Sequence, residues 1–184
     1  MASAHSEMLP LGTAAPAFEL RNAIDDGLVR LSDLERQHGL LVMFICNHCP
    51  YVVHIREKLG ELCDRWLSRG LAVVAVNSNS LRTHPQDGPA AMKALAIEKR
   101  WRFPFLFDET QQVAREYDAR CTPDFFLFDG QRKLVYRGQF DDSRPGNSLP
   151  VIGNDLELAV DSLLSTGMPV PNQKPSIGCS IKWD

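Results

Sequence analysis

Hydrophobic and polar positions alternate along the chain in blocks that predict strands and helices in turn. Two short, unbroken apolar runs, residues 40–45 and 71–76, are typical of strands buried on both faces of a sheet. Between these runs, apolar residues recur every three or four positions from Val52 to Trp66, which predicts an amphipathic helix. Gly70 then marks the end of that helix. A polar loop over residues 77–88 and a helix from Pro89 to about Arg100 come next.

The second half of the chain continues the same alternation and then changes it. Asp108 and Gln111 have the spacing of a capping box, which predicts a helix that begins after Asp108 and ends near Tyr117. Asp129-Gly130 is a hairpin turn signal between two short apolar runs. The remaining predicted elements are strands at residues 103–107, 124–128 and 133–137 and a helix at residues 154–166 that stops at Gly167.

Strands that alternate with helices predict parallel pairing with right-handed crossovers, and the closing hairpin adds antiparallel strands. The pattern therefore predicts an α/β fold, with a mixed central sheet and helices on both faces. The length of 184 residues suits a single domain over residues 1–184, with a core over about 12–167 and an extended tail over 168–184. In such a sheet, the functional site is expected at the carboxyl ends of the strands.

Composition excludes several classes of protein. Apolar residues (44%) and charged residues (23%) are both near the globular average, which argues against a disordered chain. The formal net charge of -3 offers no basic surface for nucleic acid, and no apolar stretch approaches the roughly 18 residues that a membrane helix needs. Because the first ten residues lack the basic and apolar regions of a secretory signal, we expect a cytoplasmic protein with neither a nucleic-acid nor a membrane partner.

The first buried strand leads directly into Cys46-Asn47-His48-Cys49, and the predicted helix follows. A cysteine pair at this junction lies near the positive end of the helix dipole, which favours a thiolate. The two-residue spacing allows one sulfur to attack a mixed disulfide that the other has formed. A protonated His48 would stabilise the thiolate further and make the pair more oxidising. The sequence therefore predicts a redox-active dithiol that works without a cofactor.

A metal site is the alternative from another class of function. Cys46, His48 and Cys49 would supply thiolate and imidazole ligands for zinc or copper. The other three cysteines are isolated in the sequence, so the second half of a structural zinc site is missing. In a reducing compartment, a spaced cysteine pair is more often catalytic or metal-binding than structural.

A second motif, Cys121-Thr122-Pro123, directly precedes the strand predicted at residues 124–128. A trans proline at the start of a strand is sterically ordinary. A cis Thr122–Pro123 bond that holds a loop beside the cysteine pair is the functional alternative. Both conformations remain open from the sequence.

Three segments together resemble the peroxiredoxin-like branch of the thioredoxin superfamily, the redoxins of the alkyl hydroperoxide reductase/thiol-specific antioxidant type. They are residues 44–50 (FICNHCP), 121–129 (CTPDFFLFD) and 174–183 (KPSIGCSIKW). The resemblance implies a thioredoxin-like fold, which is a three-layer α/β/α sandwich. It also implies that Cys46 is an exposed nucleophile and Cys49 the resolving thiol. Pro123 would be a cis proline whose loop backbone pairs with an extended substrate.

The chain departs from these families at positions that matter for the chemistry. Leu40 stands where thioredoxins have a buried carboxylate, so no proton acceptor is expected under the pair. In the peroxiredoxin signature, Val42 replaces proline, Cys46 replaces threonine, and Pro123 stands at the place of the activating arginine. These departures argue against efficient peroxidase chemistry. The candidate substitutes for the missing arginine are Arg120, Arg137 and Arg144.

Pro50 bears on which sulfur reacts. Proline disfavours helical geometry at the preceding residue, so the helix is expected to begin at Pro50 with Cys49 at its N-terminal cap. That arrangement favours Cys49 as the thiolate, as in a peroxiredoxin, whereas a thioredoxin-like site exposes Cys46. Both assignments remain open from the sequence.

The remaining candidates lie outside the pair. Cys63 is on the apolar stripe of the predicted helix and is expected in the core. Cys121 and Cys179 are candidate additional redox thiols, and Thr122 is a candidate supporting residue. The alternative for the tail around Cys179 is simple docking on the sheet edge through Ile177, Ile181 and Trp183.

The motifs together predict an enzyme, a thiol–disulfide oxidoreductase. Its partners would be disulfides or dithiols of proteins or small molecules, together with a reductant system of unknown identity. A thiol peroxidase that acts through Cys49 is the alternative enzyme. A metal-binding protein that uses Cys46, His48 and Cys49 is the alternative outside enzymes.

Overall fold

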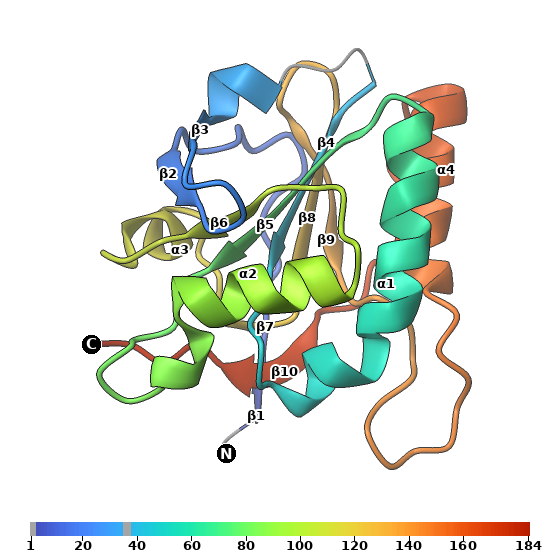
Figure 1. Cartoon of the computed structure of the whole chain (residues 1–184). Helices are drawn as coiled ribbons and strands as arrows, with labels where there is room; N and C mark the ends of the chain where they lie inside the picture. The colour runs from blue at the N-terminus through green and yellow to red at the C-terminus, as the bar shows by residue number, and fades with distance from the viewer. Residues whose placement is uncertain (1–2, 35–37) are drawn as a thin grey trace.

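The computed structural model describes residues 3–34 and 38–184 and shows a central sheet with helices packed against it (Figure 1). Residues 1–2 and 35–37 of the predicted domain lie outside the described residues. Among the described residues, the sheet has seven strands in this order: β3 (Leu28–Arg30), β2 (Glu19–Asn22), β6 (Phe105–Phe107), β5 (Ala72–Asn77), β4 (Leu40–Phe44), β8 (Asp124–Phe128) and β9 (Leu134–Gly138).

The central strands pair as the alternation of elements predicts. β4 is parallel to β5, with Leu40 opposite Ala72, and β5 is parallel to β6. β8 runs antiparallel to β4 and continues through the hairpin into β9, so the predicted mixed sheet is confirmed. The strand predicted at residues 103–107 begins only at Phe105, because Pro104 has no N–H to donate to the ladder.

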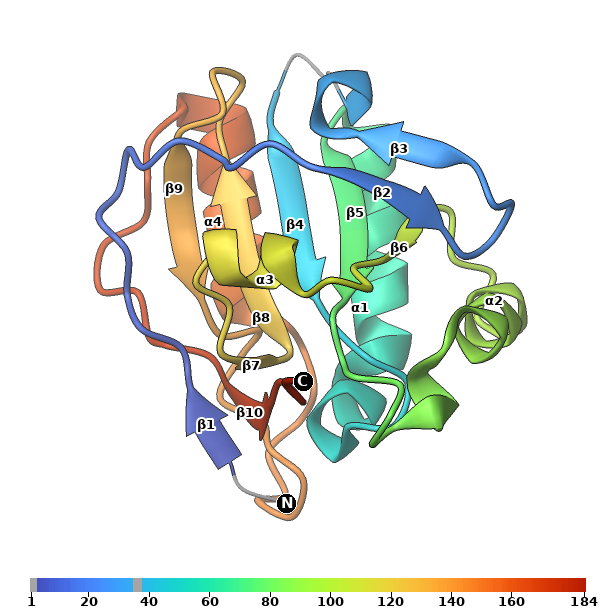
Figure 2. The ribbon, with the colours of Figure 1, turned by 90° about the vertical axis from the view of Figure 1, so that its left-hand side faces the viewer.

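Alternate side chains of each central strand enter two separate cores. The helices that cover them are α1 (Pro50–Ser68), α2 (Pro89–Glu98), α3 (Gln112–Glu116) and α4 (Asn154–Thr166). Leu41 and Met43 of β4 pack with α1, α2 and α4, whereas Val42 and Phe44 pack with α3. Figure 2 shows α3 on the near face of the sheet and α1 and α4 behind it. The predicted helices on both faces are confirmed.

A smaller sheet joins the two ends of the chain. β10 (Ile177–Ser180) lies between β1 (Ser3–His5) and β7 (Cys121–Thr122) and pairs antiparallel with both. Part of the predicted tail is therefore a paired strand. The sequence pattern did not predict β1, β2, β3 or β7, because each is only two to four residues long and too short to show a period.

The capping box predicted at Asp108 is wrong. The helix begins at Gln112, and Gln111 before it has a left-handed backbone (φ 61°). Asp108 still serves this helix, because its carboxylate accepts hydrogen bonds from the N–H groups of Val113 and Ala114 (3.4 and 2.9 Å). No helix within residues 3–34 and 38–184 combines the length and apolar character needed to cross a membrane.

Candidate active site

The cysteine pair lies between β4 and α1, beyond the carboxyl end of β4, as predicted. The helix begins at Pro50, and Cys49 is its N-terminal cap with extended backbone angles (φ −61°, ψ 121°). Proline at the first helical position lacks an N–H and keeps the residue before it out of helical geometry. The structure therefore places Cys49, rather than Cys46, at the helix end where backbone N–H groups are unpaired.

Cys46 is not the exposed nucleophile that the resemblance implies, because only 1% of its surface is accessible. Its sulfur lies 3.5 Å from the hydroxyl oxygen of Thr122 and 3.9 Å from Nδ1 of His48. The pKa of Cys46 is raised, first because its thiol hydrogen bonds to Cys49, and then because burial and the negative charge of Asp87 disfavour its thiolate. Cys46 is thus a buried thiol whose pKa is raised.

Cys49 is fully buried, and its thiol donates a hydrogen bond to the carbonyl oxygen of Thr122 (3.0 Å). The pKa of Cys49 is lowered to about 5, chiefly because the Cys46 thiol hydrogen bonds to its thiolate. Further hydrogen bonds from Thr122, Cys179 and the backbone of Val52 lower it as well, while burial acts in the opposite direction. Of the two sulfurs, Cys49 is the one whose pKa is lowered.

A buried carboxylate that the sequence reading missed lies beside the pair. Asp87 is fully buried, and its Oδ2 lies 2.6 Å from Nδ1 of His48. The same carboxylate accepts hydrogen bonds from the N–H of Asn47 (3.0 Å) and the side-chain amide of Asn79 (2.8 Å). Leu40 leaves no carboxylate under the pair on β4, as expected, but the sequence reading did not foresee a carboxylate from another element. Asp87 reaches the pair from the loop after β5 instead of from β4, where Leu40 stands.

The Thr122–Pro123 peptide bond is cis, the second of the two conformations that the sequence left open. Thr122 ends β7, and its carbonyl oxygen lies against the Cys49 sulfur while its hydroxyl lies against the Cys46 sulfur. Of the predicted supporting residues, Thr122 thus contacts the cysteines through both its hydroxyl group and its carbonyl oxygen.

Two of the other cysteines also gather here. Cys179 is buried opposite Thr122 in the β10–β7 register, and burial raises the pKa of Cys179 to about 12. Cys121 is buried with its thiol 3.5 Å from the carbonyl oxygen of Pro123, and burial raises its pKa. Cys63 is a buried residue of α1 and faces the core, as predicted.

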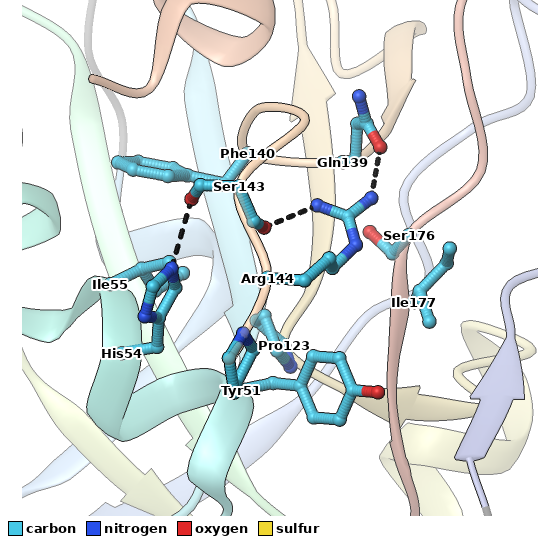
Figure 3. Close-up of a pocket in the computed structure, with 11 residues that line it drawn as sticks. Tyr51, His54, Ile55, Pro123, Gln139, Phe140, Ser143, Arg144, Ser176 and Ile177 are labelled. Atoms are coloured by element: carbon cyan, nitrogen blue, oxygen red, sulfur yellow. Dashed lines mark hydrogen bonds between the residues drawn. The ribbon is translucent and has the colours of Figure 1, made fainter. Parts of the chain in front are cut away.

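The candidate arginines lie elsewhere. Arg137 is buried in an ion pair with Asp124 (3.3 Å), and Arg120 pairs with Asp118 at the surface (2.8 Å). Arg144 lines a pocket beside Pro123, where Figure 3 shows its guanidinium bonded to Gln139 and to the backbone of Ser143. Within the part of the chain that the structure describes, no arginine hydrogen bonds to Cys46 or Cys49.

The structure also modifies the predicted metal ligands. Ligand atoms of Cys46, His48 and Asp87 lie within 4.8 Å of one another, and Cys49 is not part of this group. The contact of 2.6 Å between His48 and Asp87 is that of a hydrogen-bonded pair. These three residues can therefore act in one of two ways. They can move a proton from the Cys46 thiol, or they can bind a metal ion as its ligands.

Comparison with known structures finds relatives over the whole chain. An uncharacterised conserved protein from Geobacillus kaustophilus is 51% identical, with a TM-score of 0.97 and coverage of 100% of this chain and 97% of that one. A hypothetical protein from Sinorhizobium meliloti is 46% identical, with a TM-score of 0.94 and coverage of 98% of both chains. No curated protein matches.

A more distant structure identifies the fold. The thioredoxin domain of a thiol-disulfide oxidoreductase from Bacteroides vulgatus is 20% identical, with a TM-score of 0.59 and coverage of 83% of this chain and 99% of that domain. The mixed sheet and its helices define a thioredoxin-like fold, and the cysteine pair lies at its strand-to-helix junction. The model of the AhpC/TSA family matches residues 11–137. The chain belongs to this family, in the peroxiredoxin-like branch of the thioredoxin superfamily. It is an oxidoreductase.

Proposed function

We propose that the protein is a thiol–disulfide oxidoreductase whose redox groups are Cys46 and Cys49. One observation carries the proposal: Cys49 is the N-terminal cap of α1, and the hydrogen bonds on its sulfur lower its pKa to about 5. A thiol with such a pKa is ionised at neutral pH, and the thiolate is the form that attacks a disulfide. The resemblance implies that Cys46 is the nucleophile and Cys49 the resolving thiol, and this proposal exchanges those two roles.

In the proposed reaction, the Cys49 thiolate attacks one sulfur of a substrate disulfide, and the other substrate sulfur leaves as a thiolate. Cys46 then loses its proton and attacks the sulfur of Cys49, which releases the second substrate thiolate and leaves a Cys46–Cys49 disulfide. The substrate gains two electrons, and a thiol reductant outside the chain later returns them to the pair. The proposed acceptor of the Cys46 proton is the Asp87 carboxylate, which lies within 4.8 Å of the Cys46 sulfur and is held by its hydrogen bond with Nδ1 of His48.

Thr122 and Pro123 complete the proposed site. The hydroxyl of Thr122 lies 3.5 Å from the Cys46 sulfur, and its carbonyl oxygen lies 3.0 Å from the Cys49 sulfur. These two contacts support a positioning role, in which the loop before β8 keeps the two sulfurs at the distance that exchange requires.

Reduction of insulin disulfides tests the proposal. Cys49→Ser should abolish the reaction, and Cys46→Ser should halt it after one turnover with substrate attached to Cys49. Cys63→Ala, on the core-facing side of α1, is the matched control and should retain activity. Unchanged insulin reduction by Cys49→Ser would overturn the assignment.

A thiol peroxidase that acts through Cys49 is a second candidate, favoured by the position of that residue at the helix cap. Val42 and Pro123 stand where the peroxiredoxin signature has proline and arginine, so we expect slow peroxide consumption. The peroxidase assignment would replace the first proposal if rapid peroxide consumption survived Cys46→Ser and was lost in Cys49→Ser.

A metal-binding role is the candidate that the group of Cys46, His48 and Asp87 supports. Stoichiometric zinc or copper in protein purified without added metal would favour it over the redox proposal.

We also propose that the protein works in the cytoplasm, where its thiols stay reduced. Acid-quenched thiol labelling in cells should find the five cysteines reduced, whereas permanently oxidised cysteines would contradict this location.

A further inference from the structure

The C-terminal strand β10 lies directly against the residues that hold the cysteine pair. In the antiparallel register of β10 and β7, Cys179 is opposite Thr122 and Ser180 is opposite Cys121. Thr122 is the residue whose carbonyl oxygen and hydroxyl contact Cys49 and Cys46. The tail therefore reaches the pair through a single shared neighbour, as Figure 2 shows for β10 and β7.

The fit between β10 and this loop is tight. A Cβ atom added at Gly178 would lie 2.0 Å from the carbonyl oxygen of Thr122, so only glycine fits there without displacing the strand. The residues after β10 hold it in place: the N–H of Ile181 donates to the carbonyl oxygen of Arg120 (3.1 Å). The N–H of Lys182 donates to the Asn79 side chain (2.9 Å).

The position of β10 limits access to the sulfurs of Cys46 and Cys49. The edge of a strand is where an extended peptide adds through backbone hydrogen bonds, and the edge of β7 beside the pair is already taken by β10. Cys46 and Cys49 are 1% and 0% accessible. A disulfide substrate therefore has to displace β10 or another covering segment before it reaches either sulfur.

The tail also carries its own thiol to the pair. Cys179 is buried opposite Thr122, whose carbonyl oxygen lies 3.0 Å from the Cys49 sulfur, so Cys49 has one thiol neighbour within the pair and a second nearby on β10. Thiol–disulfide exchange needs a thiol beside a disulfide sulfur, and Cys179 meets that condition whenever Cys46 and Cys49 are joined.

We propose that β10 is an internal substrate: it occupies the strand edge where disulfide substrates bind, and Cys179 exchanges with the Cys46–Cys49 disulfide. This inference rests on the proposed function. In the step, the Cys179 thiolate attacks the sulfur of Cys49, the Cys49–Cys179 bond forms, and the Cys46–Cys49 bond breaks. Cys46 leaves as a thiolate and takes up the proton that Cys179 lost. No electrons enter or leave, so the step needs no further reactant.

Disulfide mapping tests the exchange. Wild-type protein oxidised with one equivalent of diamide, which accepts two electrons and two protons, should contain both the Cys46–Cys49 and the Cys49–Cys179 disulfides after acid quenching. Cys46→Ser should form Cys49–Cys179 within one chain. Cys63→Ala is the matched control, because it removes a buried thiol from the core-facing side of α1 and should leave the map unchanged. A free Cys179 in both wild type and Cys46→Ser would overturn the proposal.

The rate of Cys49 alkylation by iodoacetamide tests whether β10 covers the strand edge beside the pair. Gly178→Ala should displace β10 and raise this rate about tenfold or more, because labelling follows the population of the open form. Gly27→Ala is the control, since the atom nearest to its added methyl is in the exposed Asp25 side chain (3.1 Å). Equal rates in a folded Gly178→Ala variant, checked by circular dichroism, would overturn the proposal. If that variant does not fold, disulfide mapping of the wild type decides.

Insulin reduction separates this inference from the proposed function. If the proposed function is wrong, Cys49→Ser still reduces insulin. If only the internal substrate is wrong, insulin reduction depends on Cys49 as expected, while Cys179 stays free and the alkylation rates of the two glycine variants agree.

Discussion

At the scale of single residues, the two sulfurs of the pair differ in the direction in which their pKa values are shifted. The charge of Asp87 contributes to the raised pKa of Cys46, whereas the pKa of Cys49 is lowered. Two thiols in one environment with pKa values moved in opposite directions are suited to different roles, one as the attacking thiolate and one as the thiol that resolves.

We predict that Asp87→Asn slows resolution without preventing the first attack. The amide keeps the size of the side chain but cannot accept a proton, and general bases contribute about a hundredfold or more to such steps. The lifetime of a mixed disulfide on Cys49, followed by rapid acid quenching across a range of pH, should lengthen by about that factor. Asp26→Asn, at an exposed surface position, should leave the lifetime unchanged. Equal lifetimes at every pH would show that Asp87 only packs the loop.

The lowered pKa of Cys49 predicts a dependence of stability on pH. Its folded pKa of about 5 lies below the ordinary value of 9.0. The stabilisation is therefore complete above pH 9, falls as the pH is lowered, and is lost below about pH 5. The urea midpoint of the reduced protein should rise between pH 5 and pH 9, and Cys49→Ser should remove that rise. Thiolate absorbance that first appears near pH 9 would contradict the assignment.

At the scale of elements, β8 and β9 carry an ion pair inside the sheet layer. Asp124 and Arg137 are both fully buried, and the guanidinium of Arg137 lies 4.5 Å from the centre of the Phe126 ring. Burial raises the pKa of Asp124 to about 6, although Arg137 acts to lower it. The pair joins the strand after Pro123 to its neighbour and so supports the loop that carries Thr122.

We predict that Arg137→Met lowers the free energy of unfolding by about 3 kcal/mol or more, because it leaves a buried carboxylate without its partner. The double variant Arg137→Met/Asp124→Leu should recover most of that loss, since no buried charge is left. Urea unfolding of the single and double variants measures the difference. A double variant no more stable than Arg137→Met would show that packing, rather than the unpaired charge, causes the loss.

At the scale of the whole molecule, the two ends of the chain meet at the active site. Ser3 of β1 is opposite Cys179 of β10, and Thr122 of β7 is the partner of Cys179 on the other side. We propose that the chain folds as a single domain, because these contacts link the first and last segments to the cysteine pair.

A single domain predicts one cooperative transition. Far-ultraviolet circular dichroism, which follows the helices, and the fluorescence of Trp183, which packs on Arg115, should report the same urea midpoint. The fluorescence is best followed in a variant with the other two tryptophans replaced by phenylalanine. An earlier transition of Trp183 would show that the tail unfolds separately from the sheet.

The sequence by itself determined the elements whose patterns are local. The apolar run of β4, the periodicity of α1 and the cysteine pair between them are readable because each depends on neighbouring residues. Pro50 likewise predicted that Cys49 would be the cap, since its steric effect acts on the adjacent residue.

Only the tertiary structure decided what surrounds the pair. Asp87 reaches Asn47 across 40 positions of the chain, and Thr122 reaches Cys49 across 73. No periodicity reports such contacts, because they depend on how the strands are ordered and on the loops between them. The burial of both sulfurs and the docking of β10 follow from the same long-range packing. For that reason Cys46, which the resemblance implied to be exposed, is buried in the folded chain.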